Sequence, residues 1–368
     1  MKNNNIKKSK LSNFKNKLDF WATNSEEGGW NISSTDEGSQ KMLENENEKQ
    51  IKIQTGTEVV DDFVIEEETS DDERMIVNMG PQHPSTHGVL RLQAELEGEV
   101  VRRVKPIIGY LHTGMEKTGE ELNYFQGPTN TTRMDYLSPL FNELVFSLTT
   151  EKLIGIEVPK RAETIRILMT ELNRVSSHLV ALATGGMDIG ALSMMIFGFR
   201  ERELILDFFE KTTGLRMNHN YIRPGGVAAD LPDGWQKDVK EILKIIPEKL
   251  QDYDDMLLDN PIWKGRLQNV GILTTEECFA YGITGPSLRA SGYSWDLRKS
   301  QPYSGIENYD FDIPILNEGD VFARWRVKVL EIFESLKIIE QAMNNMPKGP
   351  YKVQDKKITP PPRTRLDE

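Results

Sequence analysis

The sequence predicts an α+β protein, with a mainly helical body preceded by a small antiparallel sheet. Apolar and polar residues alternate after Met75, as in strands, and long apolar stripes at helical spacing fill the chain beyond about residue 136. Residues 1–74 are rich in Asn, Lys, Glu and Ser, and they carry more than half of the net charge of −12. We therefore expect a disordered acidic extension over 1–74 and one folded domain over 75–368.

The predicted sheet lies at the start of the folded part. Met75–Met79 is the first apolar stretch, and strict alternation over 90–97 predicts a strand with one buried face. Glu97–Gly98 supplies a turn, after which Val100–Val104 returns as a second strand.

Two long helices are predicted from apolar stripes. The first starts near Pro159 and is expected to stop at Gly185–Gly186, and its stripe consists of Ile165, Leu168, Leu172, Val175, Leu179 and Leu182. The second runs from Trp325 to Met343 and ends before Pro347. Shorter helical patterns cover about 136–154, 191–211 and 236–257.

Composition excludes several classes of function. The acidic balance argues against a nucleic-acid partner, because such binding needs clustered Lys and Arg. The single cysteine, Cys278, cannot form an internal disulfide or hold an iron–sulfur cluster, and neither a dinucleotide nor a P-loop motif occurs. The most apolar stretch, Val175–Phe199, is broken by glycines and Asp188, and the first residues lack the apolar region of a signal peptide. We expect membrane contact only through partner proteins.

The segment Gly80–Gly88 (GPQHPSTHG) is the first candidate for a site. Its prolines disfavour a helix, so His83 and His87 would not share a helix face as metal ligands do. It is a polar loop at a sheet edge, the kind that presents groups to a ligand. A plain turn with two capping histidines explains the same residues equally well.

Two further segments contain chemically useful side chains. Tyr136 follows Arg133 and Asp135 at the start of a helix, and its hydroxyl can donate a hydrogen bond from an apolar wall. From their spacing, Arg133 and Asp135 more commonly form a surface ion pair. Asp188 between apolar helices would need a partner, such as His87 or His178, although a helix N-cap before Gly190 is an equal alternative.

Two loops remain. Arg216–Gly226 contains glycines but no phosphate-binding motif, and Thr284–Gly292 contains Arg289, which could meet an anion or a partner surface.

In chain order these segments closely resemble the D subunit of NADH–quinone oxidoreductase, the 49-kDa-type quinone-site component of respiratory complex I. The resemblance covers about 75–365 and rests on MGPQHPSTHGVLRL, GYLHTGMEKT, RMDYL, VPKRAETIR with NRVSSHL, NYIRPGGV, TGPSLRASG with PYSG, and KITPPPR. It implies a fold like that of the nickel–iron hydrogenase large subunit. The metal of that enzyme is excluded, because two C-x-x-C pairs hold it and this chain has only Cys278.

The resemblance also implies roles for single residues. His87 and Tyr136 would hydrogen-bond the quinone headgroup from opposite sides of a narrow chamber, with Asp188 paired to His87. Arg133 and His219 would lie near the last [4Fe–4S] cluster, which belongs to the neighbouring B subunit. Electrons would pass from this cluster to quinone, and His87 and Tyr136 would deliver protons.

The implied setting is a proton-translocating complex. The chain itself would bind no metal or other cofactor, and its partners would be quinone and the B, C, I and membrane H subunits. It would lie peripherally on the cytoplasmic side of the cell inner (plasma) membrane.

The sequence departs from the family's pattern in two places. Asn218 stands where several members carry the first of two adjacent histidines, which puts pH-linked tuning of the cluster in doubt. The chain also stops at Glu368, where the family normally continues, so we expect a truncated or split gene or a fragmentary sequence. The alternatives are a relative that serves a ferredoxin- or deazaflavin-linked donor, and a non-catalytic structural or assembly remnant.

Overall fold

The structure is a computed structural model that describes residues 74–355. The chain divides at Arg74 into two units, and nearly all described residues belong to the second, Met75–Glu368. The predicted acidic extension therefore lies outside the described residues, apart from Arg74. The motif KITPPPR, at 357–363, also lies outside them.

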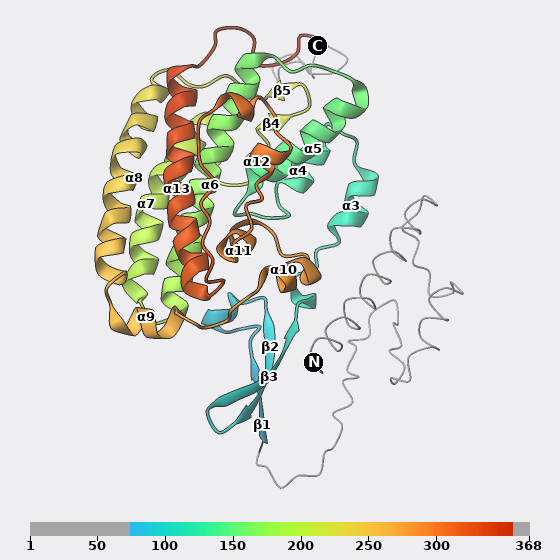
Figure 1. Ribbon diagram of the computed structural model, residues 1–368. Coiled ribbons are helices and arrows are strands. Elements are labelled where there is room, and N and C mark those ends of the chain that lie inside the picture. Colours follow the sequence, from blue (N-terminus) through green and yellow to red (C-terminus); the bar gives the residue numbers. More distant parts are fainter. Residues whose placement is uncertain (1–73, 356–368) are drawn as a thin grey trace, which may run out of the picture. The chain divides into compact units, whose positions relative to one another are not determined.

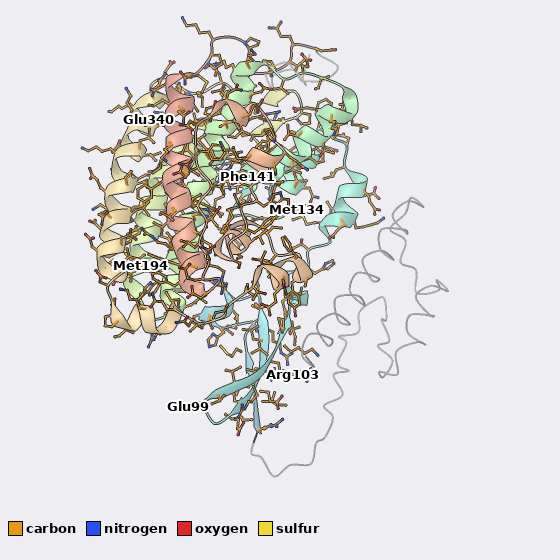
Figure 2. All side chains as sticks on the ribbon, viewed as in Figure 1. Glu99, Arg103, Met134, Phe141, Met194 and Glu340 are labelled. Carbon is orange, nitrogen blue, oxygen red and sulfur yellow. The ribbon has the colours of Figure 1, made fainter. Side chains whose placement is uncertain are left out.

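A small sheet opens the described part, as predicted, and it has three strands. Its order is β1 (Arg74–Met79), β2 (Arg91–Glu97), β3 (Val100–Ile107), and β2 pairs antiparallel with β3 through a turn that contains Glu99, labelled in Figure 2. The expected buried face is only partly present: Ala94 is buried, whereas Val101 and Val104 of β3 are about half exposed. Within residues 74–355, this face of the hairpin is therefore covered at Ala94 and left partly open at Val101 and Val104.

Four long helices form the body (Figure 1). The central helix α6 (Lys160–Asp188) packs against α7 (Leu192–Thr213) and α13 (Val321–Asn344), and α8 (Trp235–Leu257) packs on α7 and α13. The predicted stripe of α6 is confirmed, since all six of its apolar residues are buried in one core cluster. All four helices agree with the predicted ranges to within a few residues.

The predicted end of α6 at Gly185–Gly186 is wrong, because the helix continues to Asp188. Gly186 serves packing instead: a Cβ there would lie 2.6 Å from the Cβ of Met194 on α7. The glycine lets the two helices approach closely, and the backbone stays helical because α7 covers it. A glycine signals a helix end only where no neighbouring helix needs the space.

The remaining elements connect the sheet, the bundle and each other. Helix α5 (Pro139–Ile154) starts at a proline and ends at Gly155, which has a positive φ of 74°. A two-residue hairpin, β4 (Ile222–Arg223) with β5 (Gly226–Val227), contacts α5 and α6. The short helices are α3 (Met115–Glu121), α4 (Gly127–Thr131), α9 (Pro261–Leu267), α10 (Thr275–Tyr281), α11 (Gly285–Ala290) and α12 (Leu297–Ser300), with 3₁₀ turns at Pro84–Thr86, Gly109–Leu111 and Ile306–Asn308.

Candidate functional site

The loop Gly80–Gly88 is irregular apart from one 3₁₀ turn, and its own side chains hold it in shape. Buried Thr86 donates from Oγ1 to the carbonyl oxygens of Pro81 and His83, at 3.2 and 3.1 Å. His83 caps the turn, with Nδ1 accepting from the Ser85 N–H at 3.2 Å. The capping interpretation is therefore right for His83.

His87 differs from His83. It closes the turn with a left-handed backbone (φ 54°), and its side chain is exposed. Across residues 74–355 its imidazole takes part in no hydrogen bond or ion pair. The fixed loop thus presents one histidine whose two ring nitrogens are both available to a ligand.

Tyr136 lies in the turn before α5, and 55% of its surface is exposed. Its hydroxyl has no hydrogen-bond partner in the described part of the chain. The expected Arg133–Asp135 ion pair is not formed there: Arg133 donates to the Thr129 carbonyl, and Asp135 accepts from the Leu137 N–H at 3.0 Å. Arg133 and Asp135 thus form hydrogen bonds within their own segment, whereas the Tyr136 hydroxyl forms none with the described residues.

Asp188 is the last residue of α6, and it is exposed. The predicted burial between helices is wrong, and so is the predicted cap, because the N-cap of α7 is Ala191. His178 is not its partner either, since the His178 Nε2 lies 2.8 Å from Glu331 on α13. No ion pair or hydrogen bond of residues 74–355 joins Asp188 to His87, so their pairing stays a prediction.

His219 is buried (4% exposed) in the loop between α7 and β4. Its ring lies edge-on to that of Phe209, with the ring centroids 4.8 Å apart. Its Nδ1 lies 3.0 Å from the Leu215 carbonyl oxygen. Burial lowers the pKa of His219 to about 4, so the imidazole is neutral at pH 7 and Nδ1–H donates to Leu215. The adjacent Asn218 has a buried Oδ1 with no partner among the described residues.

Glu143 of α5 is a site residue that the sequence analysis missed. Its Oε1 accepts from the Thr132 hydroxyl and the Asn220 N–H, both at 2.6 Å, and its Oε2 accepts from the N–H groups of Tyr221 and Ile222 at 2.8 and 2.9 Å. The signal was available: Glu143 falls on the same helix face as Leu140, Leu144 and Ser147. A charged residue inside a buried stripe implies a specific partner.

The loop Thr284–Gly292 is not open to a ligand through Arg289, contrary to one expectation. Most of it folds into α11, and Arg289 is buried with its guanidinium 2.6 Å from Glu331. Arg289 also donates to the Trp295 carbonyl at 2.9 Å. This arginine anchors α11 to α13.

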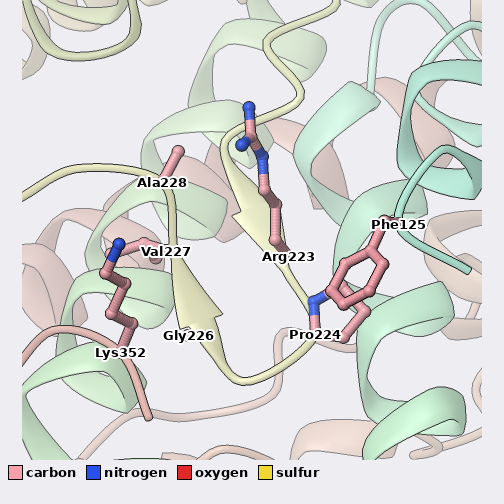
Figure 3. Close-up of a pocket in the computed structure, with 7 residues that line it drawn as sticks. All are labelled: Phe125, Arg223, Pro224, Gly226, Val227, Ala228 and Lys352. Carbon is pink, nitrogen blue, oxygen red and sulfur yellow. The ribbon is translucent and has the colours of Figure 1, made fainter. Parts of the chain in front are cut away.

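A small pocket lies beside the β4–β5 hairpin, and Arg223 and Lys352 are among the residues that line it (Figure 3). Its volume is about 60 Å³, which admits a few water molecules and not a quinone ring. Phe125 and Pro224 form its apolar wall.

The structure brings some of the predicted residues together and keeps others apart. Glu143 joins the segment that carries Arg133 and Tyr136 to the segment that carries His219. The loop before His219 is also tied to α6, since Arg202 donates to Ser176 and to the Met217 sulfur. Asp188 lies twelve residues beyond Ser176 on the same helix, about 18 Å farther along its axis.

In Figure 2 the labelled Met134, next to Arg133, and the labelled Met194, near the start of α7, lie on different sides of the helical body. Residues 74–355 contain no group of three or more His, Cys, Asp or Glu side chains placed to hold a metal. None of the helices described is long and apolar enough to cross a membrane.

Comparisons with known proteins place this helical chain, with its exposed histidine and tyrosine, among respiratory-chain dehydrogenase subunits. The family described as respiratory-chain NADH dehydrogenase, 49 Kd subunit, matches residues 188–368. The chain belongs to this family, whose members include the D subunit of NADH–quinone oxidoreductase.

Three relatives, each named as a D subunit of NADH-quinone oxidoreductase (D 1 in Salinispora), illustrate the match. The chain is 57% identical to that of Salinispora arenicola over 79% of its length and 66% of the relative's. It is 58% identical to the Rhodococcus jostii protein over 79% of its own length and 67% of the relative's. It is 54% identical to the Mycobacteroides abscessus protein over 85% of its own length and 73% of the relative's. The chain thus spans about two thirds of the length of the curated relatives it matches.

Proposed function

We propose that this chain forms the quinone-reducing chamber of a proton-translocating NADH–quinone oxidoreductase, together with an iron–sulfur B subunit. One observation carries the proposal. His87, Tyr136 and Asp188 are all exposed, and none uses its polar side-chain atoms within the described residues. Each is carried by a segment that is itself held in place, so their free groups are available to a ligand.

In this proposal the headgroup lies between His87 and Tyr136. The imidazole N–H and the phenol O–H each donate a hydrogen bond to one quinone oxygen, and they supply the protons that the reduced ring needs. Asp188 pairs with His87 in this arrangement. Arg133 and His219 lie near the partner's cluster.

The cluster, when bound in the partner, supplies the electrons. This chain contributes no thiolate set to it, since its one cysteine, Cys278, is fully buried. The C, I and membrane H subunits are the further proposed partners, with peripheral attachment to the inner membrane. We also propose kinship of the fold to the large subunit of nickel–iron hydrogenases.

Site-directed variants in the assembled complex test the proposal. His87→Ala and Tyr136→Phe should each lower kcat/KM for a short-chain quinone by about tenfold or more, because a buried hydrogen bond to the ligand is lost. Electron transfer to an artificial acceptor upstream of quinone should be unchanged. Tyr281→Phe is a matched control, since Tyr281 is even more exposed and has no assigned role.

Full quinone reductase activity in either variant would refute the site. If complexes that contain this chain show no such activity even without substitutions, the non-catalytic remnant is the better explanation.

A further inference from the structure

Among residues 74–355, the buried carboxylate of Glu143 accepts hydrogen bonds from both segments that bear proposed site residues. Thr132 is the direct neighbour of Arg133, four residues before Tyr136, and Asn220 follows His219. The Thr132 hydroxyl and the Asn220 N–H both donate to the same oxygen, Oε1, at 2.6 Å. The two segments therefore share one acceptor oxygen.

The second buried carboxylate of α5, that of Glu151, has a cationic partner, unlike that of Glu143. Glu151 is paired with the Arg166 guanidinium, at 2.5 and 3.0 Å, and accepts from the Gly225 N–H at 2.7 Å. Glu143 has no cationic partner within residues 74–355, and burial raises its pKa to about 7 although four hydrogen bonds oppose the rise. Helix α5 thus holds residues 220–225 through two carboxylates, those of Glu143 and Glu151. Of these two, only Glu151 pairs with a cation among the described residues.

We propose that Glu143 is a positioning residue that holds Tyr136 and Arg133 at a set distance from His219. Its Oε2 accepts hydrogen bonds from Ile222 of β4 and from Tyr221, the residue before that strand. Its Oε1 accepts one hydrogen bond from each of the two segments. The inference rests on the proposed function, because Tyr136 matters here as a quinone ligand. It adds a residue that touches neither quinone nor cluster.

Replacement by glutamine separates this role from simple burial. Glu143→Gln keeps the size of the side chain but exchanges one acceptor oxygen for an NH₂ group. If the NH₂ takes the Oε1 position, it can donate to Thr132 but faces the Asn220 N–H. If it takes the Oε2 position, it faces the N–H groups of both Tyr221 and Ile222. At least one buried N–H loses its acceptor in either case.

The experiment compares variants in the assembled complex. Glu143→Gln should raise KM for a short-chain quinone by about tenfold, because a displaced Tyr136 binds the headgroup less well. Complex content and reduction of an upstream artificial acceptor should stay within about twofold of the wild type. Hydrogen–deuterium exchange of the peptide containing Asn220–Ile222 should become faster, which gives a readout independent of turnover.

Thr132→Val tests the shared oxygen. It should raise KM in the same direction. The double variant should be no worse than Glu143→Gln alone, because the amide orientation that leaves one N–H without an acceptor, rather than two, places the change at Oε1. Ser147→Ala is the matched control: Ser147 is fully buried one turn farther along α5, and its hydroxyl has no partner in the described residues. Its KM and exchange should equal those of the wild type.

Two results would overturn the inference. The first is an unchanged KM in Glu143→Gln. The second is a maximal rate that falls only in proportion to complex content, which is the sign of a purely structural role. Tyr136→Phe separates the two proposals: if it raises KM while Glu143→Gln does not, only the positioning role fails. If Tyr136→Phe also leaves kcat/KM unchanged, the quinone site itself is wrong.

Discussion

Glu151→Gln should strongly destabilise the folded chain, because it leaves the Arg166 charge buried and unpaired. The Arg166 guanidinium is 0% exposed and makes two hydrogen bonds to Glu151. Its other acceptors are the carbonyl oxygens of Gly226 and Arg223, which carry no net charge. Breaking a buried pair from one side costs about 3–5 kcal/mol. We expect the free energy of unfolding to fall by about that amount.

The assay is urea unfolding of the purified full-length chain, followed by tryptophan fluorescence. Glu120→Gln is the matched control, since the Lys117–Glu120 pair is 76% and 64% exposed and its loss should change stability by less than about 0.5 kcal/mol. The double variant Glu151→Leu with Arg166→Met should lose less stability than the sum of the two single changes, because no charge is left buried. A loss below about 1 kcal/mol in Glu151→Gln, or strict additivity in the double variant, would refute the reasoning.

Two further predictions concern packing and pH. Gly186→Ala should destabilise the chain by about 1–3 kcal/mol in the same urea assay, because the new methyl group overlaps Met194. Gly185→Ala, where nothing lies within 4 Å of the added Cβ, should be neutral or slightly stabilising. The folded-state pKa of His219, about 4, lies below the ordinary 6.5, so its burial stabilises the fold fully above pH 6.5 and less as the pH falls toward 4. His219 should therefore cause no change in the reduction potential of the partner's cluster between pH 6 and 8. A potential that falls by about 59 mV per pH unit, and no longer does so in His219→Gln, would contradict this.

The sequence predicted the secondary structure well wherever apolar periodicity was long. Apolar residues that recur every 3.6 positions predicted α6 and α13, and alternation every two positions predicted the hairpin of β2 with β3. Over many residues such a period fits only one type of secondary structure. It failed at Gly185–Gly186, where local chemistry favours a helix end and packing against Met194 overrides it. That decision depends on α7, which no short sequence window contains.

The candidate site divides in the same way. The sequence identified the loop of His87, the turn of Tyr136 and the end of α6 as the places to look, because their residue types are polar and their neighbours are structured. Residue chemistry alone could not tell His83 from His87, and only the resemblance to the family favoured His87. Only the fold shows that His83 caps a turn while the His87 side chain is free.

What the sequence by itself determined is therefore the class of fold, the family and the segments that carry chemistry. The tertiary structure decided which polar side chains are buried and which are exposed: Glu143 and Arg289 lie inside with partners far away in the chain, and Asp188 lies outside. The physical reason is that the cost of burying a charge depends on donors supplied by other elements. For Glu143 those donors come from residues eleven positions before it and from about 77 to 79 after it, and folding alone brings them to one carboxylate.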